Sequence, residues 1–150
     1  MILLDTNVVL ELAKPMLSPH VTAWFARTAT ADLYLSAITE AELRLGLQLM
    51  PHGHRRNQIA GVVNASVEVD FEGRILPFDS VAARHYAEIV AARRRLGRPI
   101  SMPDAQIAAI AKANAMPLAT RNVRDFELVG VEVIDPWADS DDENAVNARR

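Results

Sequence analysis

The sequence contains no cysteine, few aromatic residues and no hydrophobic run long enough to cross a lipid bilayer. The absence of cysteine excludes a disulfide scaffold and any metal site built on thiolates, and it is typical of proteins from a reducing compartment. A transmembrane helix needs about 20 consecutive apolar residues, which no stretch supplies. The N-terminus lacks the basic segment of a signal peptide, and Asp5 interrupts the early apolar run. We therefore expect a cytoplasmic protein with no membrane association.

Several well-known sequence motifs are also missing. The chain has no GxxxxGK[ST] loop, no GxGxxG fingerprint and no GxSxG elbow, so nucleotide hydrolysis on a P-loop, dinucleotide redox chemistry and serine hydrolysis are unsupported. Its four histidines are isolated or lie together in one predicted loop, and none has the spacing of a zinc site. The remaining candidates for chemistry are carboxylates and amides.

Length and charge favour a single domain. The 150 residues suit one hydrophobic core, and half of them are hydrophobic while 23% are charged. The formal net charge of -3 does not indicate a nucleic-acid binder, but four acids against two arginines gather in the segment 138–150. We expect a folded domain over residues 1–137 and an acidic, disordered tail over 138–150.

Strands and helices are expected to alternate along the chain. Short apolar runs predict five strands, at 2–4, 33–36, 74–78, 117–120 and 130–134. Helical periodicity and capping residues predict helices at 8–13, 18–29, 39–50, 57–71, 79–96 and 101–115. This alternation predicts an α/β fold, a three-layer α/β/α domain with a mostly parallel five-stranded sheet.

Four polar stretches follow predicted strands or open predicted helices. They are Asp5-Thr6-Asn7, Thr39 to Glu42, Ser101 to Asp104 and the segment 120–126. Taken alone, the second and third fit a capping-box pattern, the first fits a helix N-cap, and Asn122 and Asp125 fit turn residues. In a parallel sheet, however, strand carboxyl ends and the first turns of helices entering that edge meet. We therefore expect the acids of these stretches to converge on one cleft.

Convergent carboxylates repel one another, so they destabilise a fold unless they are protonated or bridged by a cation. Oxygen ligands without thiolates or paired histidines favour a hard cation, and Mg²⁺ or Mn²⁺ fits best. A carboxylate cluster that holds such an ion is a frequent arrangement for phosphodiester chemistry, because the ion lowers the pKa of a bound water and neutralises charge on the leaving oxygen.

Five segments in order resemble the PIN-domain toxins of the VapC family. They are MILLDTNVVLE, AITEAELRLGL, GRILPFD, GRPISMPDAQIAAIA and LATRNVRDFELVGVEVIDPW, within residues 1 to about 137. The resemblance implies a PIN fold, a Mg²⁺- or Mn²⁺-dependent endoribonuclease and a homodimer. It also implies the toxin role in a type II toxin–antitoxin module, with a cognate antitoxin that inserts a segment near the active site. Complexes of this kind bind operator DNA through the antitoxin.

The resemblance assigns roles residue by residue. The family's catalytic positions fall on Asp5, Glu42, Asp104, Asn122 and Asp125, and the first three match its metal-binding acids. Asn122 stands where some relatives carry Asp, and Asp125 is similar to the Asp of the frequent TRNxxDF variant. Because Asn122 adds no charge, one metal ion and two metal ions are both open.

On this basis we expect a metal-activated water to cleave single-stranded RNA and to leave 5′-phosphate and 3′-hydroxyl ends. Candidates for phosphate contacts are Arg55, Arg56, Arg93, Arg94 and Arg95. One alternative is a catalytically weakened PIN-like module that acts mainly through an antitoxin and DNA complex, for which Asn122 is the only support. The other is a structure-specific DNA nuclease, for which the chain leaves little room to grip a duplex.

Apolar residues are distributed over most faces of the helix expected at 39–50, so we expect this helix to be well buried. An antitoxin partner, in contrast, requires exposed apolar surface. The candidates for that surface are Trp24, Phe25, Leu45 and Leu49, with core packing as the alternative explanation for most of them.

Overall fold

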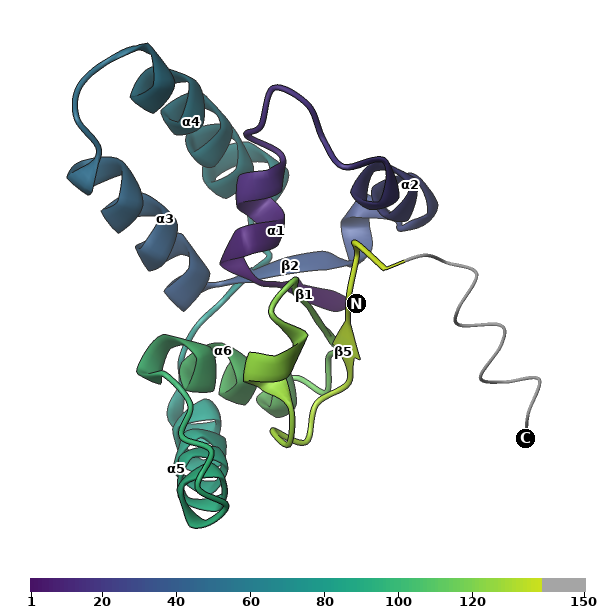
Figure 1. Ribbon diagram of the computed structural model, residues 1–150, viewed down its shortest axis with the longest axis vertical. Helices are drawn as coiled ribbons and strands as arrows, with labels where there is room; N and C mark the ends of the chain where they lie inside the picture. Colours follow the sequence, from purple (N-terminus) through teal and green to yellow (C-terminus); the bar gives the residue numbers. More distant parts are fainter. Residues whose placement is uncertain (139–150) are drawn as a thin grey trace.

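A parallel sheet forms the middle layer of the computed structural model, which describes residues 1–138 (Figure 1). The strand order is β3-β2-β1-β4-β5, and every neighbouring pair is parallel. The strands are β1 (Ile2–Leu4), β2 (Leu33–Ser36), β3 (Ile75–Leu76), β4 (Leu118–Ala119) and β5 (Val133–Ile134). The predicted five-stranded sheet is therefore confirmed, and within residues 1–138 it is parallel throughout rather than mostly parallel.

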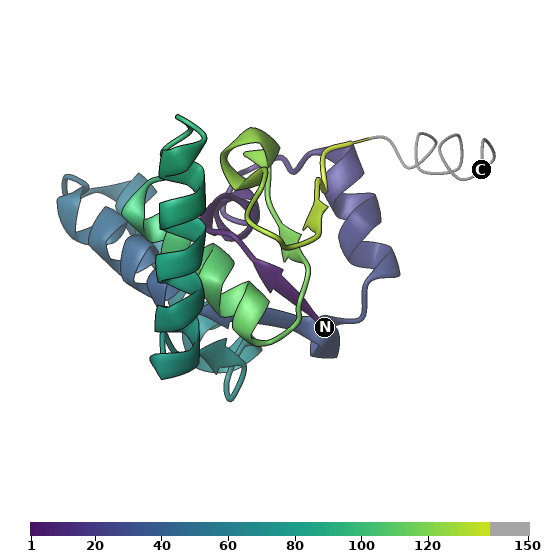
Figure 2. The same cartoon turned by 90° about the horizontal axis from the view of Figure 1, so that it is seen from below.

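Helices cover both faces of this sheet. Figure 1 shows one group above the sheet and one below, and Figure 2 views the molecule from the side of the second group. The first group is α1 (Thr6–Glu11), α2 (Pro19–Arg27), α3 (Ala37–Leu49) and α4 (His54–Ala65). The second is α5 (Ser80–Arg95) and α6 (Met102–Ala113), and these two helices pack closely together. Three short helical segments complete the described chain, η1 (Thr30–Asp32), η2 (Ser66–Asp70) and η3 (Val123–Phe126).

Alternation along β1 divides the core into two parts. Leu3 and Leu4 are both fully buried, but they belong to different hydrophobic clusters. Leu4 packs with side chains of α1 to α4, whereas Leu3 packs with side chains of α5, α6 and η3. Because successive strand residues point to opposite faces, this short central strand anchors both layers and fixes the direction of the residue that follows it.

The helix boundaries differ from the predicted ones where a cap or a bulge intervenes. The helix predicted to start at Thr39 starts at Ala37, because the Ser36 hydroxyl accepts the Thr39 amide and caps it. The predicted helix 57–71 begins earlier, at His54, and continues after Ala65 as a π-helical turn, η2. Of the two possible N-cap residues of α5, Asp79 and Ser80, the cap is Asp79, whose carboxylate accepts the Val81 and Ala82 amides.

The prediction that the helix at 39–50 is buried on most faces is wrong. Leu43 and Leu47 of α3 lie in the core, but Leu45 and Leu49 are 59% and 76% exposed. Trp24 of α2 is only 4% exposed and belongs to the core. Of the apolar candidates considered for a partner surface, Leu45 and Leu49 therefore lie on the outside of the described fold.

The predicted domain boundary at residue 137 falls next to the end of the described residues, and the predicted tail, apart from Ala138, lies outside them. None of the helices in residues 1–138 has the length and apolar composition to cross a membrane.

Candidate active site

Asp5 stands at the carboxyl end of the central strand. Its amide donates to the carbonyl of Ala119 at 2.9 Å, which ties it to the end of β4. Its side chain caps α1, because Oδ1 accepts the Thr6 amide at 2.8 Å. The residue is only 4% exposed, so its carboxylate is held between two strand ends and the first turn of a helix. The predicted N-cap role is therefore confirmed.

The second carboxylate oxygen of Asp5 collects two more hydrogen bonds. Oδ2 accepts the Thr120 hydroxyl at 2.7 Å and the Asn7 side-chain amide at 2.8 Å. Thr120 follows β4 directly and is itself fully buried. Three donors from two segments thus fix the orientation of one carboxylate, which is the kind of support a metal ligand or catalytic group needs.

Glu42 reaches the same place from α3. The Thr6 hydroxyl donates to its Oε2 at 2.5 Å, which links the second turn of α3 to the first turn of α1. The capping-box explanation of Thr39 to Glu42 is wrong, because Ser36 caps this helix. The Glu42 carboxylate is consequently free of a local capping role and is half-buried, facing Asp5 across the start of α1.

Asp104 comes from the first turn of α6. Ser101 caps this helix by accepting the Asp104 amide at 3.2 Å, and its hydroxyl donates to Asp104 Oδ2 at 2.6 Å. The predicted capping arrangement at Ser101 is therefore present. One oxygen of Asp104 is engaged locally, while the side chain as a whole lines the same cleft as Asp5.

Of Asn122 and Asp125, only Asn122 lines the cleft. Asn122 lines the cleft, and its amide donates to the Thr120 hydroxyl at 3.0 Å. Asp125 is exposed on η3, where its amide bonds to the carbonyl of Asn122, and its side chain is not among the residues that line the cleft. Only the first part of the segment 120–126 therefore lies at the site.

The cleft has a volume of about 240 Å³ and opens to solvent. Burial raises the pKa of Asp5 above its ordinary value, and the negative charges of Asp104 and Glu42 raise it further, while the hydrogen bonds from Thr120 and Thr6 lower it. The repulsive contribution shows that the three acids share one electrostatic site. The cleft is lined by Asp5, Thr6, Asn7, Leu10, Glu42, Asp104 and Asn122.

The donor set of the cleft consists of oxygen atoms, as a hard divalent cation prefers. Within residues 1–138, no group of three His, Cys, Asp or Glu side chains is arranged to enclose a metal ion by itself. A Mg²⁺ ion held here would keep part of its water shell, as Mg²⁺ usually does in protein sites.

The arginines singled out from the sequence have different surroundings. Arg93 is only 4% exposed, and its guanidinium donates to the backbone carbonyls of Arg98 and Glu127. It ties the end of α5 to the segment after η3, so the expectation that it contacts RNA does not agree with its position. Arg55 and Arg94 are exposed, and Arg56 donates to the Leu47 carbonyl at 2.9 Å.

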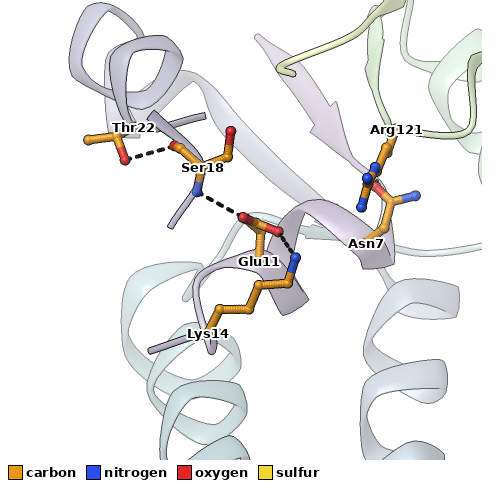
Figure 3. Close-up of polar contacts among 6 residues, drawn as sticks. All are labelled: Asn7, Glu11, Lys14, Ser18, Thr22 and Arg121. Carbon is orange, nitrogen blue, oxygen red and sulfur yellow. Dashed lines mark hydrogen bonds and ion pairs between the residues drawn. The ribbon is translucent and has the colours of Figure 1, made fainter. Parts of the chain in front are cut away.

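Glu11 and Arg121 are two charged residues near the cleft to which no sequence motif assigns a role. Glu11 is 3% exposed on α1, and its carboxylate accepts the Ser18 amide at 3.0 Å and pairs with Lys14 at 2.5 Å (Figure 3). Burial opposes its ionisation, but the hydrogen bonds from Lys14 and Ser18, with the charges of Lys14 and Arg121, lower its pKa. Arg121 lies beside Asn7, at the edge of the acidic cleft (Figure 3).

Comparison with known proteins agrees with this geometry. A family model described as the PIN domain matches residues 2–132. The chain is 44% identical over 137 residues to VapC ribonuclease Y4jK of Sinorhizobium fredii, covering 91% of this chain and 98% of that protein. It is 42% identical over 139 residues to toxin FitB of Neisseria gonorrhoeae, covering 93% and 100%. The solved structure of FitAB bound to an IR36 DNA fragment superposes with a TM-score of 0.85 at 41% identity, covering 93% and 98%.

Proposed function

Because the chain belongs to the PIN domain family, we propose that it is the VapC-type ribonuclease toxin of a type II toxin–antitoxin system and hydrolyses RNA at the acidic cleft. One observation carries the proposal: Asp5, Glu42 and Asp104 come from three different elements and meet at one edge of the sheet. Burial raises the pKa of Asp5, and repulsion from Asp104 and Glu42 raises it further. Such an arrangement destabilises a fold unless a cation or substrate uses it, so packing alone does not explain it.

The family is typically metal-dependent, and the oxygen donors of this cleft fit Mg²⁺ or Mn²⁺. Asp5, Glu42 and Asp104 would hold the ion, and the side-chain oxygen of Asn122 is available as a neutral ligand. When bound, the ion supplies a more acidic water and neutralises charge on the phosphate. Asn122 in place of a fourth acid favours one ion over two, because it contributes no negative charge.

The protein's own residues position these groups. Thr120 and Asn7 hold one oxygen of Asp5, and Thr6 holds one oxygen of Glu42. All three acids lie on a strand end or a helix, which restricts their movement more than a loop does. Attack of water on the phosphorus atom with cleavage of the P–O3′ bond, and with protonation of the departing O3′, leaves 5′-phosphate and 3′-hydroxyl ends. Asp125, exposed on η3, acts at most from the rim of the site.

Exposed arginines outside the cleft are the candidates for further contacts to RNA phosphates. Arg55 lines a groove between the end of α1 and α4 that shares Leu10 with the acidic cleft. Arg94 is exposed near the end of α5, and Arg56 keeps part of its guanidinium for solvent. These three side chains supply positive charge to an otherwise acidic protein, and such contacts strengthen RNA binding without reading its sequence.

A cognate antitoxin is the expected protein partner, and operator DNA is bound through that antitoxin rather than by the toxin. The FitAB structure, which contains DNA, is the precedent among the solved relatives. The protein forms a homodimer in the cytoplasm, and the exposed Leu45 and Leu49 of α3 are available for either protein interface. Antitoxin binding near the cleft would prevent RNA from reaching Asp5.

The test is cleavage of a single-stranded RNA by purified, antitoxin-free protein with Mn²⁺ or Mg²⁺. The variants are Asp5→Asn and Asp104→Asn, and the matched control is Glu72→Gln, which removes an exposed carboxylate that does not line the cleft. We expect metal-dependent cleavage by the wild type and by Glu72→Gln, and a loss of at least 100-fold in both cleft variants.

Cleavage that persists in a chelator, or that is equal in all four proteins, would contradict the proposal. A folded, metal-loaded wild type that cleaves no RNA would instead favour a weakened PIN-like module that acts through its antitoxin and DNA. In that case Asn122→Asp is the variant to assay next, because it restores the missing acid.

A further inference from the structure

The acidic cleft lacks positive charge of its own. Its lining contains three carboxylates, two amides, one hydroxyl and one apolar side chain, but no Lys or Arg. RNA approaching this cleft carries one negative charge on each phosphate, and the metal ion compensates only the phosphate that reacts. The phosphate of an adjacent nucleotide therefore needs a cation at the rim of the cleft, which none of the lining residues can supply.

Arg121 is a cation at the edge of the cleft, and its backbone is fixed there by its neighbours in the chain and by a hydrogen bond. It lies between Thr120, which donates to Asp5, and Asn122, which lines the cleft. Its backbone amide donates to Oδ1 of Asn7 at 3.1 Å. The side-chain amide of Asn7 in turn donates to Oδ2 of Asp5 at 2.8 Å. One asparagine thus fixes both the first acid of the cleft and the backbone of this arginine.

The guanidinium of Arg121 is held in place without being neutralised. It lies over the ring of Trp137 with 5.6 Å between the guanidinium carbon and the ring centroid, and the residue is exposed. Within residues 1–138 it makes no ion pair shorter than 4 Å, and among the buried acids its charge acts at longer range on Glu11, whose pKa it helps to lower. Stacking on an aromatic ring leaves the N–H groups of an arginine available for a phosphate.

Glu11, a buried acid outside the cleft, feels the charge of Arg121 but does not bind its guanidinium. Glu11 lies one helical turn beyond Asn7 on α1, and Figure 3 shows Arg121 beside Asn7 with Glu11 farther along the helix. Glu11 already pairs with Lys14 at 2.5 Å and accepts the Ser18 amide. Lys14 makes the direct ion pair with Glu11, whereas Arg121 acts on Glu11 only through its charge, so the N–H groups of Arg121 remain for a ligand.

We propose that Arg121, stacked on Trp137, binds the RNA phosphate next to the one that is cleaved and so positions the strand over the acidic cleft. The inference rests on the ribonuclease function proposed above and adds a substrate-binding residue to it. The alternative is a structural role, in which the arginine only covers Trp137 and stabilises the end of the described chain.

Two measurements on Arg121→Ala, Arg121→Lys and the control Arg84→Ala separate these roles. Arg84 is an exposed arginine on α5 and does not line the cleft. The first measurement is KM and kcat for a single-stranded RNA. The second is RNA affinity against salt concentration, measured in the Asp104→Asn background so that the strand stays intact.

We expect Arg121→Ala to raise KM about tenfold with kcat within about threefold, and Arg121→Lys to recover part of the loss. The slope of log affinity against log salt should become shallower by about 0.7, the value for one phosphate contact on a single strand. Mn²⁺ binding, followed by the rise in melting temperature, should stay as in the wild type. Arg84→Ala should leave KM and the slope unchanged.

A wild type that cleaves RNA, together with an Arg121→Ala protein whose KM and salt slope are unchanged, would overturn this inference alone. A lower melting temperature in Arg121→Ala with an unchanged salt slope would assign the residue a structural role and overturn it equally. A wild type that neither binds nor cleaves RNA would overturn the ribonuclease function, and this inference with it.

Discussion

The hydroxyl of Thr120 donates a hydrogen bond to Oδ2 of Asp5 at 2.7 Å, although 115 positions separate the two residues in the chain. Parallel pairing of β1 with β4 brings them together, because it places Leu4 opposite Ala119 and so aligns the two residues that follow. Sheet register therefore supplies the hydroxyl that orients the carboxylate of Asp5 and that favours its charged form.

Thr120→Val should remove this hydrogen bond while keeping the shape of a fully buried side chain. We expect the free energy of unfolding to fall by about 1–3 kcal/mol, because the hydroxyl also accepts the Asn122 amide. The hydrogen bond favours the charged form of Asp5, so its loss should raise the pKa of Asp5 further and shift the acid limb of kcat/KM to higher pH. A pH–rate profile measures the shift. Thr120→Ser should behave as the wild type, and an unshifted profile for Val would contradict the account.

Metal binding should stabilise the protein in a pH-dependent manner. Since the folded protein raises the pKa of Asp5, the associated stability is fully present below the unfolded value near 3.8 and is lost as pH rises through the folded pKa. Mn²⁺ offsets that loss only when Asp5 is ionised. At 100 times its dissociation constant we expect about 2.7 kcal/mol of stabilisation at pH 8 and far less at pH 4. Thermal melts with and without Mn²⁺ measure the difference, and an equal effect at both pH values would argue against binding at Asp5.

Local sequence signals were sufficient where the interaction is local. The run Ile2–Leu4 followed by Asp5 indicated a buried strand ending in an acid, and Ser101 followed by Asp104 indicated a capped helix. Both features depend on residues within a few positions of one another. Thr39 and Glu42 gave the same kind of signal but a wrong cap, because Ser36 at the end of β2 was better placed to bond the free amide.

The positions of the arginines depend on tertiary contacts between distant parts of the chain. Arg93 looked like a surface arginine in a basic run, yet its guanidinium donates to a carbonyl 34 positions away. Arg121 belongs to the polar stretch 120–126, but its place over Trp137 depends on the pairing of β4 with β5. No periodicity within a single helix or strand contains that information.

Glu11→Gln should destabilise the protein at neutral pH. The lowered pKa of Glu11 means that its contribution to stability is present above the unfolded value near 4.5 and is lost as pH falls through the folded pKa. We expect a loss of about 1 kcal/mol at pH 7, because glutamine can still accept the Ser18 amide but cannot pair with Lys14. Urea unfolding at pH 7 and pH 3 should show the difference shrinking in acid. Glu132→Gln, at an exposed position, is the matched control, and a pH-independent difference would refute the ion-pair explanation.

Truncation of two leucines of α3 should have very different effects on the free energy of unfolding. Leu43 is 3% exposed in the core, whereas Leu49 is 76% exposed. Leu43→Ala should lower the free energy of unfolding by about 2–5 kcal/mol through lost burial and a cavity. Leu49→Ala should change it by less than about 0.5 kcal/mol in the isolated protein. Urea unfolding measures both. A large loss for Leu49→Ala that grows with protein concentration would show that this face is covered in an oligomer.

Asn122→Asp should lower the stability of the metal-free protein and raise its affinity for Mn²⁺. The new carboxylate would line the cleft beside Asp5 and Asp104, so without metal we expect the melting temperature to fall by a few degrees through like-charge repulsion. With Mn²⁺ the extra charge becomes favourable, and we expect several-fold tighter binding by calorimetry. Asn64→Asp makes the same chemical change on the exposed surface of α4 and should affect neither quantity. Tighter binding with a ratio of two ions per protomer would show that Asn122 limits the natural site to one ion, whereas unchanged affinity would place residue 122 outside the coordination sphere.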